Sequence, residues 1–182
     1  MSIRREYEIA FVGLKPGMHE FQYEVNDQFF EEYGAQDFTN TTASIKLALD
    51  KSNGFMILRF AVGGKADVVC DRCGSDLLLQ LFDDFTITVK LTDEPDVMNE
   101  QEEDPYVYYI SRGESHIDVK DWIYEFINLS IPMQKTCEFE QMDGPQCNPA
   151  AKDLLSKMRV ESEQVKNPLW KGLEKFKDLD TE

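Results

Sequence analysis

The stretch "ASIKLALDKSNGFMILRFAV", residues 43–62, carries the clearest fold signal in the chain. Ile45, Leu47 and Leu49 alternate with polar or small residues, and a second apolar run follows at 55–62. Alternation with a period of two is typical of a half-buried strand. Asn-Gly between two such runs favours a tight hairpin turn. The segment therefore predicts two antiparallel strands joined by residues 51–54.

Strand patterns continue on both sides of this hairpin. The Gly-Gly pair at 63–64 indicates a bulge or bend in the second strand. Further apolar alternation predicts strands or extended segments at 5–12, 18–25, 76–91 and 106–110. Between them, residues 26–34 have an Asn/Asp start and a Gly stop, which favours a short helix.

The strongest helix signal is "DVKDWIYEFINLSIP", residues 118–132. Trp122, Ile123 and Phe126 belong to an apolar stripe with helical spacing. Asp118 is a candidate cap and Pro132 a helix stop. We expect an α+β fold, a mainly antiparallel β-sheet packed by one long amphipathic helix, with a short helical C-terminal tail.

Two short amphipathic segments at the C-terminal end define the expected tail. "NPAAKDLLSKMR" and "NPLWKGLEKFKDL" each begin with Asn-Pro, which suits an N-cap followed by the first helical position. We therefore expect a single α+β domain over residues 1–148 and a helical tail over 149–182.

Composition and charge restrict the function classes. The chain has 182 residues, 42% of them apolar, and a formal net charge of -16. Bulk electrostatics of this sign oppose nucleic-acid binding and favour a basic protein partner. Residues 93–104 hold seven acids and no base, and we expect a solvated, mobile loop there.

No apolar run is long enough to cross a membrane, and no secretory signal pattern follows the first residues. We therefore expect a cytoplasmic protein with no membrane partner. In that compartment, four cysteines indicate metal ligands or free thiols before disulfides.

The stretch "VVCDRCGS", residues 68–75, places two of these cysteines at the expected tip between two strands. A C-x-x-C turn brings two thiolates to one metal ion, and the glycine behind it tolerates a positive φ. Cys70 and Cys73 would form a structural zinc site if Cys137 and Cys147 approach them. The alternatives are four structural thiols without metal, or a redox pair. A redox pair is the less favoured reading, because such pairs usually open a helix.

Other site chemistry is sparse. The phosphate-binding, serine-hydrolase and HExxH zinc-protease motifs are absent from the sequence, so we predict no enzyme and no small-molecule substrate. In the tail, an aromatic ring lies among bases, a mixture that can clamp nucleic acid or simply mark a helix docked on a core. Candidate contacts to RNA or a partner are therefore Arg72, Trp170, Lys171, Lys175 and Lys177.

The order of these motifs resembles the YceD-like family, the large ribosomal RNA subunit accumulation proteins. In that family a C-x-R-C knuckle precedes a strand, and an acidic loop leads to Ile-Asp and an apolar helix that ends in proline. A second cysteine segment and an Asn-Pro tail follow. The resemblance spans roughly residues 60–180. The residues on this pattern are Cys70, Arg72, Cys73, Ile117, Asp118, Pro132, Cys137, Gly144, Cys147, Asn167, Pro168, Trp170, Leu173 and Phe176.

The resemblance implies a non-enzymatic ribosome-biogenesis factor that supports 23S rRNA accumulation and large-subunit assembly. Its partner would be 23S rRNA or a large-subunit precursor. Charge favours a second hypothesis, an acidic escort that binds a basic ribosomal protein. A thiol redox protein is the third.

Overall fold

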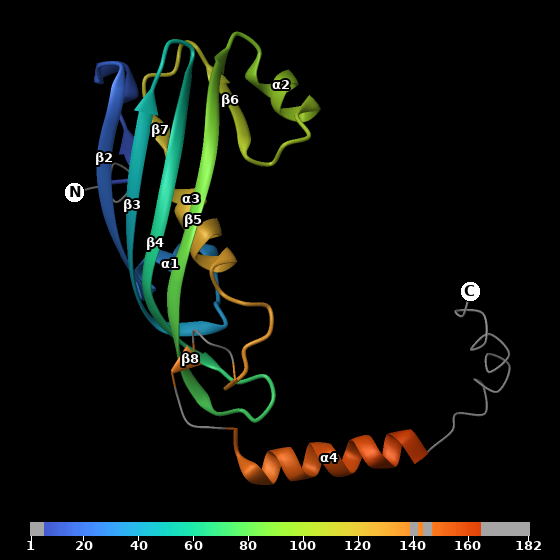
Figure 1. Ribbon diagram of the computed structural model, residues 1–182. Coiled ribbons are helices and arrows are strands. Elements are labelled where there is room, and N and C mark those ends of the chain that lie inside the picture. The colour runs from blue at the N-terminus through green and yellow to red at the C-terminus, as the bar shows by residue number, and fades with distance from the viewer. Residues whose placement is uncertain (1–5, 139–141, 144–146, 165–182) are drawn as a thin grey trace, which may run out of the picture.

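The computed structural model describes residues 6–138, 142–143 and 147–164. Its main feature is a long, curved sheet that runs the length of the molecule (Figure 1). Four long strands follow one another in antiparallel order: β2 (Gly17–Asn26), β3 (Phe38–Lys51), β4 (Phe55–Val69) and β5 (Asp76–Thr92).

Shorter strands complete the sheet and a small satellite ribbon. β6 (Val107–Ser111) joins β5 in parallel, and β8 (Met142–Asp143) pairs with β5 in antiparallel orientation, which gives a mixed six-stranded sheet. β1 (Glu8–Ile9) and β7 (Ile117–Asp118) form a separate antiparallel pair. The strand predicted at 5–12 is thus shorter than expected.

The hairpin predicted from residues 43–62 is confirmed. Its strands β3 and β4 turn through Gly54, whose φ of 87° lies in the region that glycine tolerates best. Gly64 on β4 approaches β3 closely, since a Cβ there would lie 2.2 Å from the carbonyl oxygen of Thr42. The register shifts next to this point, between Thr39 and Thr42 on the partner strand. The Gly-Gly pair therefore marks a close backbone approach opposite a bulge.

The described residues form four α-helices: α1 (Asp27–Phe30), α2 (Pro95–Gln101), α3 (Lys120–Leu129) and α4 (Pro149–Gln164). α1 continues into a 3-10 turn at Glu31–Tyr33, and Asn26 caps α1 by accepting a hydrogen bond from the Gln28 N–H. α2 was not predicted, and it lies within the acidic segment 93–104. α4 leads away from the sheet at its lower end in Figure 1.

The expected fold class, α+β with a mainly antiparallel sheet packed by one long amphipathic helix, is wrong. The described chain is mostly β with short helices, and its sheet is mixed, because β6 runs parallel to β5. No single long amphipathic helix of the described residues packs on the sheet, because α3 has only 10 residues. With the usual rise per residue of an α-helix, α3 is about 15 Å long. The 17 residues of β5 extend over about 55 Å, so α3 covers only part of the length of the sheet. Asp118 lies in β7 and its side chain accepts the Lys120 N–H, so the helix begins later than predicted.

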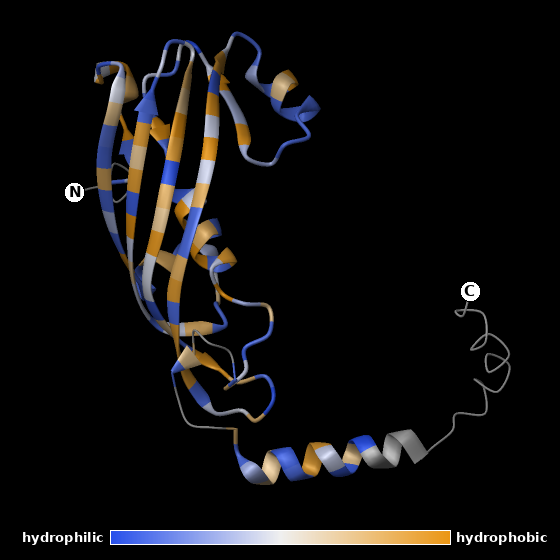
Figure 2. Cartoon of the chain, in the orientation of Figure 1, coloured by the Kyte–Doolittle hydropathy of each residue, from blue (hydrophilic) through white to orange (hydrophobic). Residues whose placement is uncertain are grey.

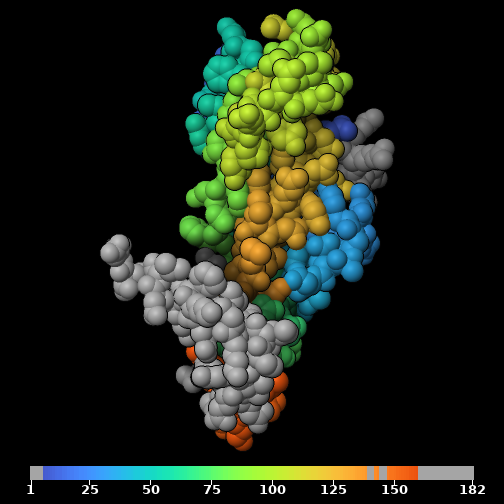
Figure 3. Space-filling view, turned by 90° about the vertical axis from the view of Figure 1, so that its right-hand side faces the viewer, coloured from blue at the N-terminus to red at the C-terminus, as the bar shows by residue number. Residues whose placement is uncertain are grey.

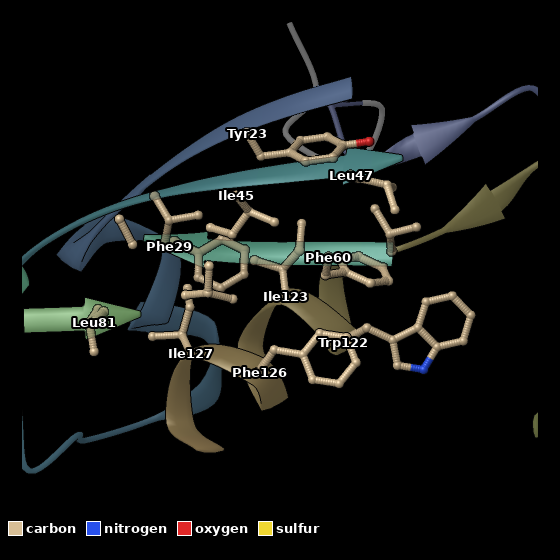
Figure 4. Packing of buried hydrophobic residues seen from close by; sticks show 14 of the residues in the cluster. Tyr23, Phe29, Ile45, Leu47, Phe60, Leu81, Trp122, Ile123, Phe126 and Ile127 are labelled. Atoms are coloured by element: carbon tan, nitrogen blue, oxygen red, sulfur yellow. The ribbon is translucent and has the colours of Figure 1, made fainter. Parts of the chain in front are cut away.

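The core lies between the inner sheet face and α3. Phe126 of α3 stacks on Phe85 with ring centroids 4.3 Å apart and meets Phe60 edge-on at 5.0 Å. Figure 4 shows this ring beside Ile123 and Ile127, which are fully buried. The strands are banded orange and blue in Figure 2, as expected when alternate side chains face the core. No helix among the described residues is long and apolar enough to cross a membrane.

Candidate metal centre

The predicted C-x-x-C knuckle is the turn between β4 and β5 at the lower end of the sheet. Cys70 follows Val69, which pairs with Asp76 across the hairpin. The turn is closed by two backbone hydrogen bonds, from Cys70 N–H to the Ser75 carbonyl at 2.8 Å and from Gly74 N–H to the Cys70 carbonyl at 2.9 Å. Gly74 has a φ of 70°, which explains the glycine behind the second cysteine.

The other two cysteines reach this turn from a distant part of the sequence. Cys137 follows α3 by eight positions, and Cys147 lies just before α4. Asn148 caps α4 by accepting the Ala150 N–H at 3.0 Å, as the Asn-Pro motif predicted. The chain after α3 therefore returns to the tip of the β4–β5 hairpin before α4 begins.

All four sulfur atoms lie within 4.8 Å of one another. The Sγ atom of Cys137 is 3.5 Å from that of Cys70 and 3.6 Å from that of Cys73. A tetrahedral zinc ion with four thiolate ligands separates its sulfurs by about 3.8 Å. The donor set and its spacing thus fit a closed, four-coordinate metal site.

The surroundings of the sulfurs separate their proton affinities. The pKa of Cys73 falls to about 5, because the thiolate accepts hydrogen bonds from the Ser75 hydroxyl and from the backbone N–H of Asn148 and Ser75. Burial opposes ionisation of Cys70, but backbone N–H groups of the turn outweigh it and lower the pKa. Backbone N–H donors are thus already aimed at thiolate charge, as a metal site requires.

The other two thiols hold their protons. Burial, followed by hydrogen bonds to the neighbouring sulfurs, raises the pKa of Cys137 to about 12. Burial also raises the pKa of Cys147. A divalent metal ion would displace these protons, because coordination deprotonates a thiol.

A clamp that sequence reasoning missed holds the Cys137 segment on the knuckle. The Asp71 N–H donates to the Lys135 carbonyl at 2.7 Å, and the Lys135 N–H donates to the Asp71 carboxylate at 2.6 Å. The side chain of Lys135 forms an ion pair with Asp37. An acid inside the C-x-x-C turn was the available signal, but its partner is 64 positions away.

Ion pairs add a second connection around the knuckle. Arg72 contacts the Glu138 carboxylate at 2.9 Å, and Lys152 of α4 contacts the same carboxylate at 3.1 Å. These two bases hold the pKa of Glu138 below its usual range. Arg72, a predicted RNA or partner contact, is therefore engaged in an internal ion pair.

The remaining predicted contacts, Trp170, Lys171, Lys175 and Lys177, lie outside the described residues. The redox reading gains no support from the local fold, since the C-x-x-C turn joins two strands and does not open a helix.

The fold and the site together define the class of this protein: it is a β-sheet protein with a cluster of four cysteines at one end of a curved sheet. The family model for the large ribosomal RNA subunit accumulation protein YceD matches residues 58–177, and the chain therefore belongs to this family. The match covers more than half of the chain and confirms the resemblance inferred from the motifs. No curated protein and no solved structure matches the chain.

Proposed function

We propose that this protein is a non-enzymatic factor that supports 23S rRNA accumulation and assembly of the large ribosomal subunit. The observation that carries the proposal is the family match over residues 58–177, whose description names accumulation of the large ribosomal RNA subunit. The protein would act in the cytoplasm on 23S rRNA or on a large-subunit precursor.

Within this function the cysteine cluster has a structural role. Cys70, Cys73, Cys137 and Cys147 would hold one zinc ion, which would supply four metal–sulfur bonds and no reaction. The spacing of the sulfurs and the N–H groups aimed at Cys73 support this assignment. The knuckle, the Cys137 segment and the start of α4 would then form one rigid end.

Depletion of the protein tests the function. Sucrose-gradient profiles and the ratio of 23S to 16S rRNA should show fewer large subunits and less 23S rRNA, and the protein should sediment with large-subunit precursors. Normal profiles and no co-sedimentation would contradict the proposal. Complementation with a Cys70→Ser, Cys73→Ser variant tests the structural role of the cluster, because loss of zinc should lower the protein level together with activity.

The tail is the proposed RNA contact. The bases Lys171, Lys175 and Lys177 accompany Trp170 in an otherwise acidic chain, and their replacement by alanine should weaken binding to 23S rRNA fragments and reduce its salt dependence. A matched triple variant, Lys15, Lys46 and Lys65 to alanine, removes the same charge elsewhere. Equal losses in both variants would contradict a role specific to the tail.

An acidic escort for a basic ribosomal protein is the second candidate. The net charge of -16 and the seven acids of residues 93–104 favour it. In the structure this segment carries α2, which forms one wall of a groove.

A further inference from the structure

A groove of about 460 Å³ lies between α2, β6 and the start of α3, at the opposite end of the sheet from the cysteines. Figure 3 looks onto this side, where the yellow-green surface of residues 93–111 borders the orange surface of α3. Its lining residues are Pro95, Asp96, Asn99, Tyr108, Tyr109, Ile110, Ser111, Glu114, His116, Ile117, Asp118, Asp121, Trp122 and Glu125.

Two aromatic rings belong to the apolar part of this groove. Tyr108 is 41% exposed and meets Trp122 edge-on, with ring centroids 5.2 Å apart. Trp122 is only 7% exposed, yet it lines the groove, and its indole N–H has no hydrogen-bond partner in the described part of the chain. This N–H is not among the buried unpaired atoms of the described residues, so it is accessible in the groove, and an indole N–H at such a site can donate to a bound partner. The groove thus offers an exposed ring face and an unused donor.

Carboxylates surround these rings. Asp118 and Asp121 are engaged, since Asp118 accepts the Lys120 N–H and Asp121 accepts the Tyr33 hydroxyl. The side-chain carboxylates of Asp96, Glu114 and Glu125 are exposed and have no hydrogen bond or ion pair with any described residue. No lysine or arginine is among the lining residues of the groove.

The wall formed by α2 is held in place without a ligand. The Asn99 side chain donates to the Tyr109 carbonyl and accepts the Tyr109 N–H, both at 2.8 Å. The Tyr109 hydroxyl donates to Glu102 at 2.9 Å. A preformed wall lowers the entropy cost of binding.

We propose that this groove binds a lysine- or arginine-rich peptide segment of a partner protein. A cationic side chain of the peptide over the Tyr108 ring would form a cation–π interaction. The neighbouring cationic side chains of the peptide would form ion pairs with the free carboxylates. A backbone carbonyl of the peptide would accept the Trp122 indole N–H. That the partner is a ribosomal protein rests on the proposed function, whereas the peptide chemistry does not.

The charge of the groove argues against RNA, because phosphates would face five carboxylates. A second hollow of the sheet gives the contrast. It has a volume of about 710 Å³ and lies on the outer face of the sheet, where Lys46 and Arg59 are mixed with Glu20 and Asp84. That mixed surface selects neither sign of charge.

Fluorescence anisotropy with a short fluorescein-labelled Arg-Gly repeat peptide tests the proposal on the full chain. The Glu114→Gln, Glu125→Gln double variant should weaken binding about fivefold, because two exposed ion pairs are lost. Tyr108→Leu keeps an apolar side chain but removes the ring face, and should weaken binding about threefold. A Gln-Gly repeat peptide should not bind.

Glu20→Gln, Asp84→Asn is the matched control, since it removes the same charge from the outer sheet face. Equal weakening by both double variants would show attraction by net charge alone and would overturn the proposal. Binding of the Gln-Gly peptide, or preference for a labelled oligouridylate over the Arg-Gly peptide, would overturn it too. Circular dichroism on each variant excludes loss of fold as the cause.

The outcomes also separate this inference from the proposed function. If depletion lowers 23S rRNA but the groove variants bind the peptide like the wild type, the groove assignment alone fails. If the groove binds the peptide as described but depletion leaves the ribosomal profiles normal, the assembly function alone fails.

Discussion

The cysteine end and the groove end of the sheet share one strand, β5, but different interactions close them. Asp76 begins β5 directly behind the knuckle, and Thr92 ends it beside Ser111 of β6. At the lower end, four sulfur atoms and the reciprocal Asp71–Lys135 hydrogen bonds connect three segments of the chain. At the upper end, Asn99 and the Tyr109–Glu102 hydrogen bond hold the α2 segment on β6, and exposed carboxylates have no partner among the described residues.

This contrast separates stability from recognition. A closed four-thiol site has no free ligand position, which suits a structural task. An open groove with unpaired carboxylates lowers the stability of the free protein through like-charge repulsion. A partner of opposite charge would relieve this repulsion, so such a groove suits a binding surface. Changes at the lower end should therefore lower the stability of the whole protein, whereas changes at the upper end should act locally.

Metal removal should give the largest effect. Treatment with a chelator, or the Cys73→Ser substitution, should lower the melting temperature by about 10 °C relative to zinc-loaded protein, since a ligand in large excess over its dissociation constant stabilises the fold strongly. Elemental analysis of protein purified without chelator should give one zinc per chain. If the chelator leaves the melting temperature unchanged, the cysteines act as ordinary core thiols. The cysteine end would then gain no stability from a metal, contrary to the proposed difference between the two ends.

Loss of the Asp71 clamp should have a smaller effect at the same end. Asp71→Ala removes the carboxylate that accepts the Lys135 N–H, and we expect a melting temperature about 3 °C lower. Asp76→Ala is the matched control, because no hydrogen bond of its side chain occurs in the described structure. If both variants have the same melting temperature, the clamp adds no stability beyond that of the cysteine cluster.

Local sequence signals predicted the parts of the fold that depend on neighbouring residues. The Asn-Gly turn, the strands around it and the knuckle with its glycine are all encoded within a few positions, because turn geometry requires particular residues there. The helix was predicted too long, since the pattern at 118–119 belongs to β7 and to the turn before α3. Periodicity also gave no strand direction, so the parallel pairing of β6 was not predicted.

The two ends differed in how much the sequence revealed. The chain has only four cysteines, so the sequence suggested one site formed by Cys70 and Cys73 with Cys137 and Cys147. The wide spacing of the second pair did not rule this site out. Glu114 and Glu125 are two among many acids, and nothing in the sequence distinguishes them. Only the fold brings them beside Tyr108, in a groove whose lining residues in the described chain include no lysine or arginine.

At the groove end, Asn99→Ala should act without changing global stability. The substitution removes both hydrogen bonds to Tyr109, so α2 should separate from β6 more often. Hydrogen exchange at the Tyr109 amide should become about tenfold faster. Gln101→Ala in the same helix is the control, because its side chain is exposed and makes no hydrogen bond to the described residues. A large drop in melting temperature would mean that this end also supports the whole fold.

The smallest effect should come from the ion pairs around Glu138, and its pH dependence identifies it. Arg72 and Lys152 lower the pKa of Glu138 in the folded protein, so the carboxylate adds stability above its usual pKa and loses that contribution as the pH falls through the lowered value. Both partners are exposed, so Glu138→Gln should lower the melting temperature by less than about 2 °C at neutral pH. The difference from the wild type should vanish in acid and shrink in high salt. A difference that persists in acid would point to packing of the side chain rather than to its charge, and the lower end would then depend on its sulfur cluster and backbone clamp alone.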